Sequence, residues 1–304
     1  MRSVTARSYG AKIALMLTAF GGFYCWANGQ AAEKERKEPA SNAKTTVRCA
    51  VIGGMTDTGF WQAAAERFEK QTGFAVEVVV TGPKYEIAGP FRRGEADLIT
   101  MHASDTIINL VADGHGVDPQ PWARNDLFLV GPKDDPAKIK GMTDAVAALE
   151  KIIEAKSKLL IHQSLGVNEV LHDLLSEGDL ELDPENTVIM PSDRQRKLLQ
   201  RAARENAYTL VGRIPFLNGK ISNEGLEIMV QGDARMRRPY VVVVASANKA
   251  DSPRGKAARQ LAEFLRTPET QRWIGEFGRG QLDDRPLFFP VVVSENNGAA
   301  ARVP

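Results

Sequence analysis

The stretch Val47-Arg-Cys-Ala-Val-Ile-Gly-Gly-Met-Thr-Asp-Thr-Gly-Phe60 shows the unit from which this chain is built. Its first six residues are almost all apolar and predict a buried strand, which Gly53-Gly54 then interrupts. A helix is expected next, with Asp57 or Thr58 as its N-cap. Apolar residues recur along one face of that helix at Phe60, Ala64 and Phe68. A strand that ends in a glycine turn and leads into a helix is the repeating unit of α/β proteins.

The same alternation continues along the chain. Further strands are predicted near residues 75–80, 97–101, 127–130, 159–161, 187–190, 208–211 and 240–245. Ser252-Pro253 and Thr267-Pro268 each predict an N-cap followed by proline in the first helical position, and Thr143 is the expected cap of another helix. The pattern predicts an α/β fold. Because no linker divides the chain into tandem halves, we expect two discontinuous lobes joined by crossing strands.

The N-terminus has the order of a secretory signal. Arg2, Arg7 and Lys12 precede a short apolar run that extends to Trp26, and small residues follow. We therefore expect a signal peptide over residues 1–32 and a periplasmic or otherwise extracytoplasmic location, with a retained membrane anchor as the alternative. Residues 33–45 are charged and polar and predict a disordered tether. Residues 291–304 are expected to form a flexible tail.

Composition and motifs argue against several classes of function. The net charge of +1 gives no strong field to attract nucleic acid. After removal of the signal, Cys49 is the only cysteine left, so it predicts a buried thiol and no disulfide. The histidines form no metal-ligand pair at helical spacing, and no nucleophile elbow or phosphate-binding loop is present. We expect no catalytic residues, no metal, no cofactor and a monomeric protein.

Three strand-to-helix turns are candidates for anion binding, because backbone N–H groups at a helix start attract negative charge. They lie at residues 51–60, 161–168 and 190–195. Such turns are also ordinary connections of an α/β fold. The candidate donors are the backbone near Gly53, Gly54 and Gly166, and the hydroxyls of Thr56, Thr58, Ser164 and Ser192.

From residue 46 to residue 290 the chain resembles the periplasmic tungstate-binding proteins. The blocks that carry the resemblance lie in order at residues 60–73, 94–103, 113–117, 125–136, 205–213, 238–240, 267–269, 274–278 and 286–290. The resemblance implies a type-II periplasmic-binding fold, an ABC transporter permease as partner, and a small oxyanion, tungstate or molybdate, as ligand. Lobe one is expected over 46–130 and 243–290, and lobe two over 131–242. The crossings are expected near 128–132 and 240–245.

The chain departs from this family where the family holds its ligand. The family's run of hydroxyl residues after the first strand is Val51-Ile-Gly-Gly54 here, and the family's arginine-containing loop is Ile161–Asn168, without an arginine. Arg213, in a block that matches the family, is the expected substitute for the lost arginine. Two alternatives stay open: the same fold binding a different solute, such as sulfate or an organic acid, and a signalling or interaction module with a degenerate pocket.

Overall fold

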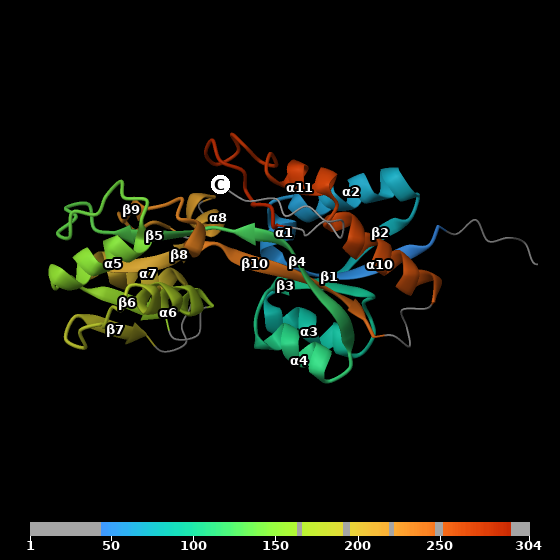
Figure 1. Ribbon diagram of the computed structural model, residues 1–304, viewed down its shortest axis with the longest axis horizontal. Coiled ribbons are helices and arrows are strands. Elements are labelled where there is room, and N and C mark those ends of the chain that lie inside the picture. Colours follow the sequence, from blue (N-terminus) through green and yellow to red (C-terminus); the bar gives the residue numbers. More distant parts are fainter. Residues whose placement is uncertain (1–43, 163–165, 191–194, 219–221, 247–251, 293–304) are drawn as a thin grey trace, which may run out of the picture. The chain divides into compact units, whose positions relative to one another are not determined.

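Two five-stranded sheets organise the computed structural model (Figure 1). The structure describes residues 44–162, 166–190, 195–218, 222–246 and 252–292. The predicted signal peptide and most of the predicted tether and tail lie outside these ranges. No helix within them has both the length and the apolar character needed to cross a membrane.

The first sheet has the strand order β2-β1-β3-β10-β4. Its strands are β1 (Thr46–Ile52), β2 (Ala75–Gly82), β3 (Leu98–His102), β4 (Gly116–Asn125) and β10 (Arg238–Ala245). Strand β1 pairs in parallel with β2 and β3, whereas β10 runs antiparallel to β3 and β4. A strand from late in the sequence therefore lies between two early ones.

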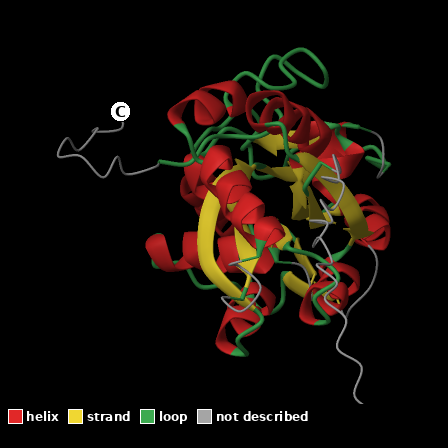
Figure 2. Ribbon diagram, turned by 90° about the vertical axis from the view of Figure 1, so that its right-hand side faces the viewer, coloured by secondary structure: helices red, strands yellow, loops and turns green. Residues whose placement is uncertain are grey.

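Helices cover this sheet (Figure 2). They are α1 (Gly53–Asp57), α2 (Phe60–Thr72), α3 (Lys84–Arg92), α4 (Asp105–Ala112), α10 (Pro253–Leu265) and α11 (Pro268–Ile274). Both predicted Ser/Thr-Pro caps are confirmed, because the Ser252 hydroxyl accepts a hydrogen bond from the Gly255 amide and Thr267 accepts one from Thr270. A cap of this kind is worth about 1 kcal/mol to a helix.

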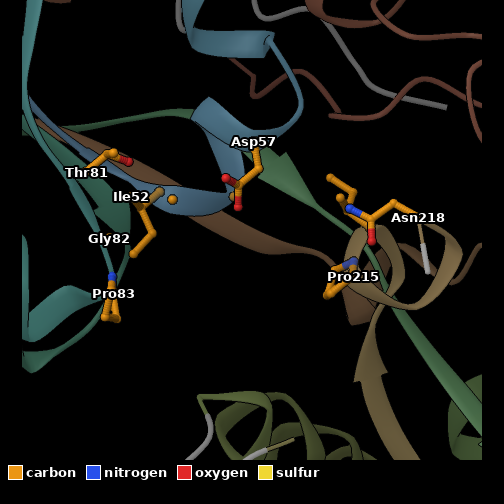
Figure 3. Close-up of a pocket in the computed structure, with 10 residues that line it drawn as sticks. Ile52, Asp57, Thr81, Gly82, Pro83, Pro215 and Asn218 are labelled. Carbon is orange, nitrogen blue, oxygen red and sulfur yellow. The ribbon is translucent and has the colours of Figure 1, made fainter. Parts of the chain in front are cut away.

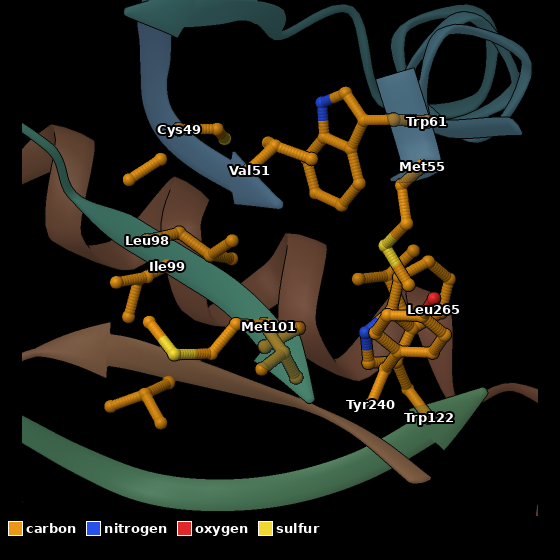
Figure 4. Packing of buried hydrophobic residues seen from close by; sticks show 14 of the residues in the cluster. Cys49, Val51, Met55, Trp61, Leu98, Ile99, Met101, Trp122, Tyr240 and Leu265 are labelled. Atoms are coloured by element: carbon orange, nitrogen blue, oxygen red, sulfur yellow. The ribbon is translucent and has the colours of Figure 1, made fainter. Parts of the chain in front are cut away.

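Apolar side chains from both faces of the first sheet form its core (Figure 4). Phe60 is fully buried, and its ring stacks 3.9 Å from that of Phe288 and 5.3 Å from that of Trp122. Cys49 is a free, buried thiol, as the sequence predicts, and burial raises its pKa well above the ordinary value. The C-terminal part of the chain is thus packed directly against the first helices.

The second sheet has the order β7-β6-β8-β5-β9. Its strands are β5 (Leu127–Gly131), β6 (Leu159–His162), β7 (Thr187–Met190), β8 (Tyr208–Gly212) and β9 (Glu227–Val230). The associated helices are α5 (Ala145–Glu154), α6 (Val167–Glu177), α7 (Gln195–Arg204), α8 (Arg213–Leu217) and a 3-10 turn, η1 (Ala234–Met236). Strand β6 is parallel to β7 and β8, and β5 is antiparallel to β8 and β9.

The chain crosses between the sheets twice, and both crossings lie earlier than predicted. The first falls at Asp126, because β5 pairs with β8 and β9 from Leu127 onward. The second falls between Val230 and Arg238, because β10 pairs with β3 and β4 along its whole length. The α/β fold with two lobes joined by crossing strands is confirmed. The apolar runs that form β5 and β10 suit either sheet, so only their pairing places the boundaries.

Three local predictions need correction. Gly53-Gly54 ends strand β1 as predicted and begins the short helix α1, but the N-cap of α2 is Gly59, with φ 71°, and not Asp57 or Thr58. Helix α5 is capped by Asp144, which accepts a hydrogen bond from Ala147, and not by Thr143. Strand β4 gave no strand signal because it contains two prolines. The sheet tolerates them because β4 is an edge strand.

Candidate functional site

A cavity of about 200 Å³ lies where the strands of the first sheet end beside the crossings. Its lining comes from both sheets and consists of Gly54, His102, Asn125, Leu127, Gly166, Val167, Gly212, Ile214, Pro215, Arg238 and Tyr240. The polar side chains among these are few. They all come from the first sheet, whereas the second sheet contributes glycines, a proline and aliphatic side chains.

Strand pairing brings four of these polar side chains together. The register of β10 places Tyr240 opposite His102 on β3, and Arg238 opposite Asn125 on β4. Arg238 and Tyr240 are two residues apart, so they share one face of β10. The rings of His102 and Tyr240 stack with centroids 4.0 Å apart. The antiparallel insertion of β10 therefore assembles the polar wall of the cavity.

Within the described residues, Nε2 of His102 and Oδ1 of Asn125 are buried in this wall without a hydrogen-bond partner of good geometry, although the Asn125 side chain lies near enough to His102 to oppose the lowering of its pKa. Asn125 is 7% exposed. Burial lowers the pKa of His102 well below its ordinary value, and the positive charge of Arg238 lowers it further. His102 is therefore neutral at physiological pH. Buried polar groups are nearly always paired, so unpaired atoms at a cavity indicate a site prepared for a ligand or water.

Arg238 is the one cationic side chain among the residues that line this cavity. No ion pair links it to a carboxylate within the described part of the chain. Burial lowers the pKa of Arg238, an effect that Tyr240 and Glu169 oppose. A partly buried guanidinium without a counter-ion is unfavourable. It would gain charge-assisted hydrogen bonds from a bound anion.

Gly166 allows the Arg238 guanidinium to approach the start of α6. A β-carbon at Gly166 would lie 2.5 Å from Nη2 of Arg238, closer than real β-carbons approach other atoms. Gly166 is the N-cap of α6 and provides no side-chain cap. The positive end of an 11-residue helix thus meets a guanidinium at the cavity, and both favour negative charge there.

A second cavity, of about 570 Å³, adjoins the first (Figure 3). The two share Gly54, Ile214 and Pro215 as lining residues. The remaining lining of the second cavity consists of Ile52, Gly53, Asp57, Thr81, Gly82, Pro83 and Asn218. Among the described residues that line it, Asp57 is the one charged side chain, and none of them is cationic as Arg238 is in the first cavity.

The predicted ligand residues are distributed unevenly. Gly54 and Gly166 line the first cavity and Gly53 lines the second. Ser164 and Ser192 lie outside the described residues. The Thr56 hydroxyl donates to the Gly53 carbonyl oxygen at 2.9 Å, and the Thr58 hydroxyl donates to that of Gly54 at 3.0 Å. Thr56 Oγ1 also lies 2.8 Å from Thr81 Oγ1, so both threonine hydroxyls already have hydrogen-bond partners within the protein.

Arg213 lies in neither cavity lining, although its sequence position made it the expected anion partner. Its side chain is fully buried and pairs with the Asp283 carboxylate. Its Nη1 donates to the carbonyl oxygen of Pro286 at 2.8 Å. Its donors are thus used within the protein, whereas Arg238 lines the cavity and has no ion-pair partner among the residues that the structure describes. The arginine that lines the cavity is therefore Arg238, and not Arg213 as the sequence led us to expect.

Sequence reasoning missed His102, Asn125, Arg238 and Tyr240 as site residues. Each lies in a block that resembles the tungstate-binding proteins, at residues 94–103, 125–136 and 238–240. The sequence blocks that contain these residues were therefore identified, but nothing in the sequence indicated that the blocks lie close together in the fold. Only the strand order places them at one cavity.

Comparison with known proteins agrees with this architecture. The family model described as bacterial extracellular solute-binding protein matches residues 48–279. The tungstate-binding protein TupA of Peptoclostridium acidaminophilum is 29% identical over 255 residues, which cover 82% of this chain and 87% of that protein.

Two solved structures share the fold. The tungstate-binding protein TupA from Desulfovibrio alaskensis G20 aligns with a TM-score of 0.66 and 24% identity, covering 82% of this chain and all of that one. The tungstate ABC transporter protein from Geobacter sulfurreducens aligns with a TM-score of 0.60 and 24% identity, covering 76% and 98%.

Proposed function

Because the chain belongs to the family of bacterial extracellular solute-binding proteins, we propose that it is the extracytoplasmic solute-binding component of an ABC-type uptake system. It captures a small oxyanion, tungstate or molybdate, and delivers it to a membrane permease. The name of the relative from Peptoclostridium acidaminophilum, a tungstate-binding protein, supports this ligand class. The family is one of binding proteins, so the proposed role requires no catalysis.

The observation that carries the proposal is the Arg238 guanidinium, which lines a cavity between the two sheets and forms no ion pair with a carboxylate of the described residues. An oxyanion there accepts hydrogen bonds from Arg238 and from the Tyr240 hydroxyl, and it lies near the start of α6. The backbone N–H groups near Gly54 and Gly166 are further donors in this proposal. Ser164 and Ser192, which lie outside the described residues, stay candidate donors on the evidence of the sequence alone.

Arg238→Gln tests the assignment, because it removes the charge and keeps a polar side chain of similar length. A hydrogen bond to a charged group contributes about 1.5–3 kcal/mol, so we expect affinity for the oxyanion to fall about 10- to 150-fold. Calorimetric titration of wild type and Arg238→Gln with tungstate, molybdate and sulfate measures this loss of affinity. Arg92→Gln is the matched control, since Arg92 is exposed on α3 and removes the same charge away from the cavity.

Thermal unfolding gives an independent readout. A ligand that binds only the folded protein stabilises it by about 2.7 kcal/mol at a hundredfold excess over Kd. Wild type and Arg92→Gln should show this shift with the oxyanion, whereas Arg238→Gln, at the same ligand concentration, should be stabilised by only about 0.3–1.4 kcal/mol. Equal shifts in all three proteins would contradict the role of Arg238. The absence of any shift in well-folded wild type would contradict the oxyanion.

The adjoining cavity of about 570 Å³ favours a second candidate ligand. A bare oxyanion occupies only the Arg238 cavity, whereas an organic acid would place its carboxylate on Arg238 and its body along Ile214 and Pro215. The same titrations with small carboxylic acids distinguish the two. Binding of a carboxylic acid that excludes tungstate would transfer the proposal to an organic anion.

A further inference from the structure

The segment 282–289, here called the C-terminal strap, contacts both domains of the protein. The first domain is the first sheet with its helices, and the second domain is the second sheet with its helices. Its end is anchored on the first domain. The Phe289 amide donates to the Arg124 carbonyl oxygen at 2.9 Å, and the Arg124 amide donates back at 2.8 Å. The Phe288 ring stacks on Phe60 at 3.9 Å and lies 5.8 Å from Tyr240 of the cavity wall. This end of the strap is therefore part of the first core.

The start of the strap instead contacts the second domain. The Asp283 carboxylate accepts hydrogen bonds from Arg213, the first residue of α8, at Nε (3.2 Å) and at Nη2. Arg285 donates to Asp126 Oδ2 at 2.9 Å and to Gln231 Oε1 at 3.0 Å, which are residues of the two crossings. Its guanidinium also lies 5.5 Å from the centre of the Phe128 ring.

Residues of helix α8 form part of the lining of both cavities. Ile214 and Pro215, the residues that follow Arg213, line the Arg238 cavity and its larger neighbour. Helix α8 has only five residues, and its N-cap, Gly212, provides no side-chain hydrogen bond. So short a helix has little stability of its own. Its position therefore depends on tertiary contacts, which are the packing of the buried Ile214 and Phe216 side chains and the ion pair of Arg213 with Asp283.

We propose that Asp283 is a positioning residue for the solute site: through Arg213 it fixes α8, and with it the Ile214–Pro215 wall, relative to the polar wall on β3, β4 and β10. The affinity part of this inference rests on the proposed function. The positional part does not, because it concerns the protein without ligand. Asp283 lines neither cavity. Besides Arg213 it contacts Arg285, whose Nη2 lies 3.4 Å from Asp283 Oδ2, so an effect on binding passes through α8 or through the contacts of Arg285 with the crossings, and the exchange of the α8 amides identifies the first route.

Asp283→Asn tests the inference with minimal change of shape. Asp283 is 30% exposed, so the variant is expected to fold. Hydrogen exchange in the ligand-free protein is the first readout. We expect the Asn218 amide, which donates to the Ile214 carbonyl oxygen, to exchange about tenfold faster. The Phe289 amide at the anchored end should keep its wild-type rate.

Titration with the oxyanion bound by wild type is the second readout. We expect Asp283→Asn to raise Kd about fivefold or more, through a faster dissociation rate. Glu227→Gln is the matched control, because it removes the Lys140–Glu227 ion pair on the second domain away from the strap. It should change neither readout. Asp283→Glu, which restores the charge, should recover part of the affinity.

The outcomes separate the two proposals. Unchanged exchange of the α8 amides in Asp283→Asn would overturn the positioning role. So would a uniform acceleration that includes the Phe289 amide, because that indicates general destabilisation. Faster α8 exchange with unchanged Kd would also overturn it. If wild type binds no anion while α8 alone exchanges faster, the proposed oxyanion function fails and the strap's hold on α8 stands.

Discussion

The substitution Gly166→Ala should weaken ligand binding while leaving the stability of the folded protein almost unchanged. Gly166 has φ −65°, a conformation that alanine adopts without strain. The added methyl group instead meets Nη2 of Arg238 at 2.5 Å and Cζ at 3.3 Å. The Arg238 side chain must move, because the backbone of α6 is held by its own hydrogen bonds.

The size of the effect follows from these distances. Nη2 must move by about 0.9 Å to reach the 3.4 Å at which ordinary contact begins. A hydrogen bond of about 2.9 Å stretched by that amount is no longer a hydrogen bond. Loss of one charge-assisted bond costs about 1.5–3 kcal/mol, which raises Kd about 10- to 150-fold. Stability should change by no more than about 1 kcal/mol, since alanine is a poorer N-cap but restricts the unfolded chain.

Calorimetric titration and urea unfolding measure the two effects on the same samples. Gly275→Ala is the matched control. Gly275 has φ −66°, and an added β-carbon there meets nothing nearer than 3.4 Å. We expect it to bind the oxyanion as wild type does. If Gly166→Ala binds as tightly as Gly275→Ala, the guanidinium does not need its position against α6, and the proposed geometry of the site is wrong.

Two further predictions concern stability. The Tyr208 hydroxyl donates to Asp135 Oδ1 at 2.7 Å and accepts from the Ala137 amide at 3.0 Å, so Tyr208→Phe should cost about 1–3 kcal/mol in urea unfolding. Tyr85→Phe, at a side chain 79% exposed, should cost almost nothing, and equal effects would contradict this. Desolvation lowers the pKa of His102 well below its ordinary value, so the folded protein takes up this proton at a lower pH than the unfolded chain does. Stability should therefore fall below about pH 6.5, where the unfolded histidine binds one, by up to about 1.4 kcal/mol per pH unit. His102→Gln should remove that part of the pH dependence, and an unchanged slope would refute the assignment.

Local features of the fold could be predicted because they are encoded within a few residues. The apolar run before Gly53, the spacing of Phe60, Ala64 and Phe68, and the caps at Ser252 and Thr267 all appear in the structure as strand or helix. The resemblance added the order of the blocks and hence the two-lobed fold. Strand β4 was not predicted, because its two prolines argue against a strand, although an edge strand accommodates them.

The candidate site could not be predicted in the same way. Arg213 and Arg238 both lie in blocks that match the family, and nothing local distinguishes them. The strap pairs Arg213 with Asp283, whereas no carboxylate in the described part of the chain forms an ion pair with Arg238. Which arginine is free therefore depends on contacts between residues far apart in the chain.

The sequence by itself determined the α/β class, the strand-and-helix order and the membership in a binding-protein family. Only the tertiary structure decided where the lobes divide and which side chains meet. The physical reason is that strand propensity and capping depend on neighbouring residues, whereas pairing depends on partners distant in sequence. Strand β10 joins β3 and β4 from the far end of the chain, and that pairing alone brings His102, Asn125, Arg238 and Tyr240 to one cavity.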